Sequence, residues 1–120
     1  MKETSIPEII LQQLGGRRFA LMTGAKNFEA VGLTLQMSLP RNTSGANRLW
    51  ITYDEGEDLY TMRFFHDSPI RWNSKKAAFT GGQRKEIRTI HSVFCDQLQS
   101  IFREITGMET RMPRIVGINA

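Results

Sequence analysis

Nine consecutive residues, 31–39, alternate strictly between apolar side chains and small or polar ones. The apolar positions are Val31, Leu33, Leu35, Met37 and Leu39. Side chains two residues apart lie on the same face of a β-strand, so the segment is predicted to be a strand with one buried and one solvated face. Such a strand is typical of an antiparallel sheet that is covered on one side.

The segments 47–55 and 58–66 predict a β-hairpin, and two independent signals agree on its register. The apolar faces match when Leu49 pairs with Phe64, Ile51 with Met62 and Tyr53 with Tyr60. The same register leaves Gly56-Glu57 as a two-residue turn, with Gly at the position that a type II′ turn requires. The opposite face then pairs Thr52 with Thr61 and Trp50 with Arg63, where a cation–π contact is expected.

Helical signals lie near both ends of the chain. Residues 5–14 predict a short helix that begins at the N-cap Ser5 and ends at Gly15-Gly16. Residues 84–106 predict a long helix that Gly107 ends, because seven apolar residues fall on one stripe: Ile87, Ile90, Phe94, Leu98, Ile101, Phe102 and Ile105. Between the first helix and the alternating segment, residues 17–23 predict a buried strand with apolar side chains on both faces.

The expected fold class is α+β. A short N-terminal helix precedes an antiparallel sheet of four or five strands, and a long C-terminal helix packs on one face. Ile70–Trp72 or Ala77–Thr80 could add the fifth strand, and the strand order is left open. The chain of 120 residues suits one domain over 1–120, with 108–120 expected as a loosely held tail.

Composition predicts a cytoplasmic protein with an uneven charge. The net charge is +4, but residues 61–120 carry ten basic and five acidic residues, whereas residues 1–60 carry six and seven. No apolar run approaches the roughly 18 residues that span a bilayer, and the first residues lack the apolar stretch of a signal peptide. The single cysteine, Cys95, fits a reducing compartment.

Residues with catalytic or metal-binding chemistry are few, and each has a structural alternative. His91 and Cys95 would share a face of the expected helix, as a nucleophilic pair or half a metal site, although a buried Cys is more common. His66-Asp67 could be a general base with its orienting carboxylate, or a strand end with a turn. Four carboxylates, Asp54, Glu55, Glu57 and Asp58, could hold a hard cation but more often mark a solvated hairpin tip. We therefore expect no enzyme, no metal and no cofactor.

The basic excess concentrates between residues 71 and 88, which indicates a surface for phosphates or an acidic protein. Basic and aromatic residues interleave at 71–79, as on surfaces that bind single-stranded nucleic acid, although Trp72 and Phe79 could be core residues. Gly81-Gly82 before the expected helix at 84 could form an anion site or a flexible loop. The predicted nucleic-acid or partner-binding residues are Arg71, Trp72, Lys75, Lys76, Arg84, Lys85 and Arg88.

Several short runs resemble a group of small proteins encoded by phages, prophages and mobile elements of gut and related bacteria. The runs are Ile10 to Gly16, Arg18-Phe19, Met22 to Phe28, Leu59-Tyr60-x-Met62-x-Phe64, and Leu98 to Gly107. The resemblance spans roughly residues 8–108 and implies a setting rather than a mechanism. Within it, Thr23, Lys26 and Asn27 could form a binding loop, or a glycine turn followed by an Asn that tolerates positive φ.

These observations lead to one main hypothesis and one alternative. The main hypothesis is a non-enzymatic phage or mobile-element protein in the bacterial cytoplasm that binds a host protein or nucleoprotein, as an anti-CRISPR-like inhibitor of host defence does. The alternative is an accessory protein that binds DNA or RNA directly through the basic 71–88 surface. No membrane contact is expected, and Val31–Leu39, if it is an edge strand, could pair with a second copy to form a dimer.

Overall fold

Five antiparallel strands form the main sheet of the computed structural model, which describes residues 5–110. In chain order the elements are α1 (Ile6–Leu14), α2 (Arg17–Thr23), β1 (Lys26–Val31), β2 (Thr34–Ser38), β3 (Arg48–Asp54), β4 (Leu59–Asp67), β5 (Arg71–Asn73), β6 (Ala78–Thr80), β7 (Arg84–Val93), the 3₁₀ turn η1 (Cys95–Gln97) and α3 (Leu98–Thr106). The strand order of the main sheet is β1-β2-β3-β4-β7, and β5 and β6 pair separately. The α+β class is therefore confirmed.

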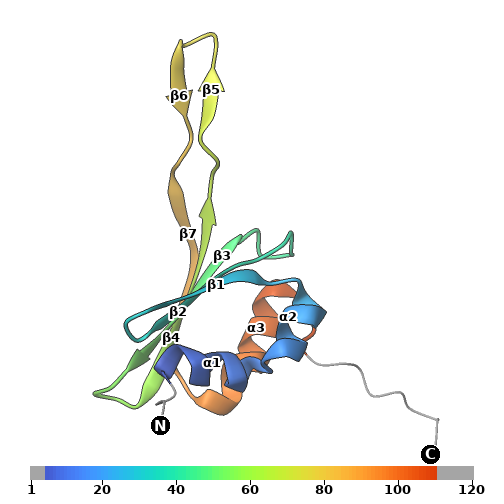
Figure 1. The fold of residues 1–120 in the computed structure, drawn as a ribbon, viewed down its shortest axis with the longest axis vertical. Helices are drawn as coiled ribbons and strands as arrows, with labels where there is room; N and C mark the ends of the chain where they lie inside the picture. The colour runs from blue at the N-terminus through green and yellow to red at the C-terminus, as the bar shows by residue number, and fades with distance from the viewer. Residues whose placement is uncertain (1–4, 111–120) are drawn as a thin grey trace, which may run out of the picture.

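The three helices gather on one face of the sheet and leave the other face uncovered (Figure 1). Their buried residues, which include Ile10, Phe19 and Phe102, form one core with the inward-facing residues of β2, β3 and β4. The N-terminal helix is confirmed as predicted, since the Ser5 side chain accepts a hydrogen bond from the backbone N–H of Glu8 and the helix ends at Gly15. The hydrophobic core therefore lies between the helices and this face of the sheet.

The predicted strand at 17–23 is wrong, because these residues form α2. Apolar side chains on both faces fit a helix as well as a buried strand. Phe19 and Thr23, four residues apart, face the core, whereas Leu21 is 76% exposed. Gly24, at φ 78°, ends the helix in a left-handed conformation that a residue with a Cβ adopts only with strain.

The alternating segment 31–39 contains the last residue of β1, a turn and strand β2. β2 keeps the predicted alternation, with Leu35 and Met37 buried and the other three residues of the strand half-buried. Gly32, at φ 58°, reverses the chain, and β1, which the sequence did not predict, pairs with β2 on the far side of this turn. The edge-strand prediction is therefore wrong for this segment, since β2 lies inside the sheet between β1 and β3.

The register of the β3–β4 hairpin is confirmed at five predicted pairs, 49 with 64, 51 with 62, 53 with 60, 52 with 61 and 50 with 63, whereas the pair of 55 with 58 that the two-residue turn required does not form. Arg63 lies 5.9 Å from the Trp50 ring, as the cation–π prediction required. The turn differs from the prediction, because the last pair is Asp54 with Leu59 and four residues connect the strands. Asp58, at φ 56°, supplies the left-handed residue, and the Asp54 carboxylate accepts the Gly56 N–H.

The predicted long helix at 84–106 is wrong over its first half, which is strand β7. Two irregularities in the β4–β7 ladder each place an extra residue in β7, so Ile87, Ile90 and Val93 follow one another at intervals of three. That spacing imitates one turn of a helix and explains the wrong prediction. The true C-terminal helix is short, α3, and packs Leu98 and Phe102 into the core before Gly107 ends it.

Residues 68–83 leave the main sheet as a two-stranded arm, which stands away from the helices and the sheet (Figure 1). Both segments suggested as a fifth strand, Ile70–Trp72 and Ala77–Thr80, contribute to this arm rather than to the main sheet.

Of the predicted loose tail, Thr110 is buried, and residues 111–120 lie outside the described part of the chain. Among residues 5–110, no helix has the length and apolar character needed to cross a membrane.

Candidate nucleic-acid interface

The arm continues the β4–β7 hairpin beyond Asp67 and Arg84. Its ladder pairs Arg71 with Thr80, Trp72 with Phe79 and Asn73 with Ala78. At the tip, the side-chain oxygen of Asn73 accepts the backbone N–H groups of Lys75 and Lys76, which closes a turn over 74–77. The two lysines therefore lie at the outermost point of the arm, where their side chains are exposed.

A backbone constriction marks the base of the arm. Ser68 and Gln83 bond across it, through Ser68 N–H to Gln83 O at 2.9 Å and Gln83 N–H to Ser68 Oγ at 3.2 Å. A Cβ on Gly81, which has φ 91°, would lie 2.0 Å from the carbonyl oxygen of Pro69. Only glycine fits there, and Pro69 lacks an N–H to continue the ladder. These breaks lie between the β4–β7 and β5–β6 strand pairs, so the sequence over 67–83 has no continuous strand pattern.

Apolar side chains on the arm face solvent. Trp72 is 58% exposed, Phe79 is 72% exposed, and their rings meet edge to face with centroids 5.2 Å apart. Ile70, at the base of the arm, is 71% exposed. The alternative interpretation of Trp72 and Phe79 as core residues is therefore wrong. The pair packs across the two strands of the arm and not in the core. Exposed apolar side chains in such a pair indicate a binding surface.

The arm is uniformly basic. Residues 68–85 include no Asp or Glu and five basic residues, Arg71, Lys75, Lys76, Arg84 and Lys85. Of these, Arg71, Lys75 and Lys76 lie on the arm proper and are exposed. The structure thus brings four of the seven predicted binding residues together, Trp72 included.

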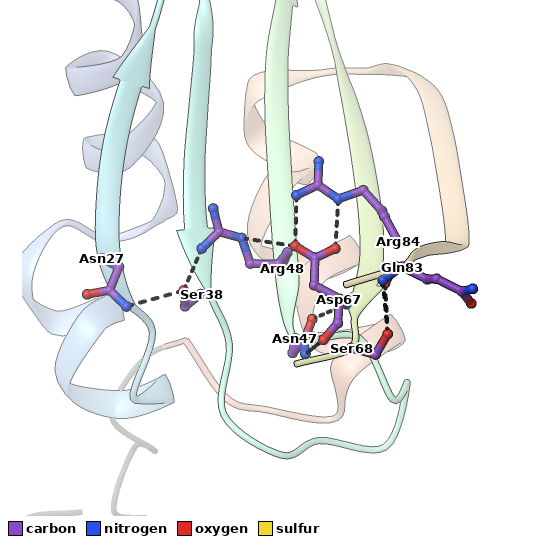
Figure 2. Close-up of polar contacts among 8 residues, drawn as sticks. All are labelled: Asn27, Ser38, Asn47, Arg48, Asp67, Ser68, Gln83 and Arg84. Atoms are coloured by element: carbon purple, nitrogen blue, oxygen red, sulfur yellow. Dashed lines mark hydrogen bonds and ion pairs between the residues drawn. The ribbon is translucent and has the colours of Figure 1, made fainter. Parts of the chain in front are cut away.

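Arg84 has a different role, as a clamp at the arm base. Its Nε and Nη2 donate to the two carboxylate oxygens of Asp67, both at 2.7 Å (Figure 2). The guanidinium also lies 4.6 Å from the Trp50 ring and 5.0 Å from the Phe65 ring. The hydrogen bonds from Arg84 hold the pKa of the Asp67 carboxyl below its usual range, and the same bonds raise the pKa of Arg84. Arg84 therefore serves the arm's attachment rather than a phosphate.

A chain of polar contacts extends this clamp across the sheet (Figure 2). Asn27 donates to the hydroxyl of Ser38 at 3.3 Å, and Arg48 donates to the same hydroxyl at 2.8 Å. Arg48 Nε in turn lies 4.0 Å from the Asp67 carboxylate. One residue from each of β1, β2, β3, β4 and β7 takes part, so the arm base is tied to all five strands. The sequence did not predict the Asp67–Arg84 pair, since its partners were assigned to a strand end and a helix.

The remaining predicted binding residues lie elsewhere. Lys85 pairs with His66 and Arg88 with Phe64, whose side chain belongs to the core, so both occupy the helix-covered face of β7. Both side chains are exposed near the edge of that face. The expected helix N-terminus after Gly81-Gly82 does not exist, because Arg84 begins a strand, so an anion at this position would not face a helix N-terminus.

The suggested binding loop at 23–27 consists mainly of structural contacts. Thr23 is buried, and its hydroxyl donates to Phe19 O and accepts from Ala25 N–H. Asn27 has φ 57°, as the alternative interpretation anticipated, and its side chain bonds to Ser38. Lys26 is exposed at the start of β1. Nothing in this geometry brings the three side chains together around a ligand.

The other chemically suggestive residues are also dispersed. His66 Nδ1 lies 2.9 Å from the carbonyl oxygen of Gly45, and His91 lies on β7 while Cys95 begins η1. Cys95 is exposed, so its expected place in the core is wrong. Within residues 5–110, no group of three or more His, Cys, Asp and Glu side chains is arranged to hold a metal ion.

Comparison of the chain with protein-family models, curated proteins and solved structures returns no match. The function must therefore be inferred from the residues and their geometry.

Proposed function

We propose that this protein is a non-enzymatic binding protein that engages nucleic acid through the β5–β6 arm. The observation that supports this most strongly is the exposed Trp72–Phe79 pair on an arm that carries basic residues and no acidic ones. Lys75, Lys76 and Arg71 would contact phosphates and release bound counterions. The rings would stack on unpaired bases, or insert beside a base step of a duplex whose groove admits a two-stranded ribbon.

The uncovered face of the sheet is a poorer candidate. Its rings, Trp50 and Phe65, lie beneath the guanidinium groups of Arg63 and Arg84, at 4.6 to 5.9 Å from the ring centroids. Arg63 is further paired with Glu86 at 3.5 Å. The rings on this face are thus covered by guanidinium groups, whereas the rings and basic side chains of the arm face solvent.

The test is a fluorescence-anisotropy titration with short single- and double-stranded DNA and RNA at two salt concentrations. Lys75→Ala/Lys76→Ala should weaken binding about tenfold or more at low salt, because two phosphate contacts are lost. Arg17→Ala/Arg18→Ala removes the same charge from exposed positions on α2 and is the matched control. Binding that both double variants weaken equally would show only a non-specific effect of net charge and would reject the arm as the site.

The ring pair is tested separately from the charges. Trp72→Ala/Phe79→Ala should weaken single-strand binding by about 1–3 kcal/mol for each base that stacks. Leu21→Ala, which shortens an apolar side chain that is 76% exposed on α2, is the control. Full affinity after loss of both rings would contradict a stacking role.

The phage or mobile-element setting and the inhibition of a host defence nuclease stay predictions. A basic, aromatic arm fits a surface where protein and nucleic acid meet, since both parts of a nucleoprotein could contact it. Adding the protein to a purified RNA-guided host nuclease, with and without the arm substitutions, tests the idea. Inhibition that requires Lys75, Lys76 and Trp72 would support it, and unchanged cleavage across several such nucleases would count against it.

A further inference from the structure

The end of the molecule opposite the arm contains an acidic, partly apolar hollow. It measures about 500 Å³, and Tyr53, Glu57, Asp58, Leu59 and Phe94 are among the residues that line it. β4 runs from this hollow at Leu59 to the arm at Asp67, and β7 returns from the arm at Arg84 to Val93 beside the hollow. The two features are thus fixed at the two ends of one strand pair.

The walls of the hollow suit a basic and aromatic ligand. Phe94 is 57% exposed, and Glu57 and Asp58 line the acidic side next to the further carboxylates of Asp54 and Glu55. The segments 53–60 and 93–97 include no Lys or Arg. Gln13 also lines the hollow. The hollow therefore offers carboxylates to a cationic group and an exposed ring to an aromatic one.

The arm has the complementary chemistry, with Lys75 and Lys76 at its tip and exposed rings at Trp72 and Phe79. An arm cannot reach the hollow of its own chain. The nine residues of β4 separate the two by ~26 Å, at about 3.3 Å for each step along a strand, and the arm extends away from the β3–β4 turn (Figure 1). Only the arm of another molecule can enter it.

We propose that the protein self-associates by docking the β5–β6 arm of one copy into the acidic hollow of a second copy. Trp72 and Phe79 pack against Phe94 and Leu59, while Lys75 and Lys76 approach Glu57 and the neighbouring carboxylates. Each copy has one arm and one hollow, so two copies in opposite orientation satisfy both contacts together. The contact does not depend on nucleic-acid binding, although the two uses of the arm exclude each other.

The test uses charge reversal at both ends. Lys75→Glu/Lys76→Glu reverses the arm, and Glu55→Lys/Glu57→Lys reverses the hollow while it keeps Asp54 and Asp58, which hold the turn. In nucleic-acid-free preparations of the full chain, sedimentation velocity should give a mass that rises above 13.7 kDa with concentration. Each reversal alone should weaken association ~10-fold or more, because like charges then meet.

An equimolar mixture of the two reversed proteins should associate again, since the acidic arm of one matches the basic hollow of the other. Glu29→Lys/Glu104→Lys, at exposed positions on β1 and α3, changes net charge by the same amount as the reversed hollow and should associate like the unmodified protein. Circular dichroism confirms that each variant is folded. An unmodified protein that stays at 13.7 kDa at every concentration would overturn the proposal, as would reversed proteins that do not recover when mixed. Neither result would bear on nucleic-acid binding, which the anisotropy titration measures independently.

Discussion

The side chain of Asp67 accepts two hydrogen bonds from Arg84, and its backbone N–H and carbonyl bond to the side chain of Asn47. Asp67 is the last residue of β4 and Arg84 the first of β7, so one ion pair closes the sheet where the arm begins. The pair lies against Trp50 and Phe65, which limits the positions the guanidinium can occupy. Its function is to hold the arm's attachment in one orientation.

Asp67→Asn should lower the free energy of unfolding at pH 7 by roughly 0.5–1 kcal/mol, a modest value because the pair is about one-third exposed and solvent screens it. The pKa of Asp67 is lowered from 3.8 in the folded state. The pair therefore contributes fully above pH 3.8, and its contribution is lost as the pH falls through the folded-state pKa. Urea unfolding of both proteins from pH 7 to acid should show curves that converge below pH 3.8, and a pH-independent difference would exclude an ionic contribution.

At the scale of elements, hydrophobic pattern was a reliable guide where strands pair regularly and misleading where they do not. The β3–β4 register followed from matched apolar faces, because a slip of one residue would turn Ile51 and Met62 to opposite sides. In β7, two extra residues convert the two-residue period into a spacing of three, so no reading of periodicity alone could distinguish it from a helix. The same error prevents the prediction of the Asp67–Arg84 ion pair. The sequence pattern assigns Arg84 to a helix, whereas the ion pair forms because β7 pairs with β4 and brings Arg84 opposite Asp67.

The arm was predictable in composition but not in placement. Basic and aromatic residues at 71–79 suggested a binding surface, and four of the seven predicted residues lie on the arm. Whether Trp72 was buried could not be read from sequence, because an aromatic residue beside a strand is normally a core residue. Lys85 and Arg88 were grouped with the arm through proximity in the chain, but the register of β7 places them on the helix-covered face.

The arm should be dispensable for folding. None of residues 69–82 is buried, and Ser68 and Gln83 already bond to each other across the base. Replacing 69–82 by Asn-Gly, which favours a tight hairpin turn, should change the free energy of unfolding by no more than about 1 kcal/mol. Urea unfolding followed by circular dichroism measures this, and the same protein should no longer bind nucleic acid. A large loss of stability would mean that the arm has a structural role.

At the scale of the whole molecule, charge is separated along β4. Four carboxylates lie in or next to the turn at its start, and the basic arm follows its end. A nucleic acid bound at the arm, as proposed, would therefore be attracted at one end of the molecule and repelled from the other. The repulsion by these carboxylates depends on ionic strength, because the ~26 Å spanned by β4 exceeds the Debye length of about 8 Å at physiological salt.

Neutralising the acidic turn should therefore affect nucleic-acid binding only at low salt. At 0.15 M salt, Glu55→Gln/Glu57→Gln should bind like the unmodified protein within about twofold, because screening cuts off the repulsion. At 0.01 M salt the Debye length rises to about 30 Å, and the variant should bind roughly two- to fivefold more tightly. The titration is made at protein concentrations where sedimentation shows the monomer alone, so that any self-association does not compete for the arm. If the affinity rises equally at both salt concentrations, the carboxylates lie against the nucleic acid itself, and the binding surface must include the end of the molecule opposite the arm.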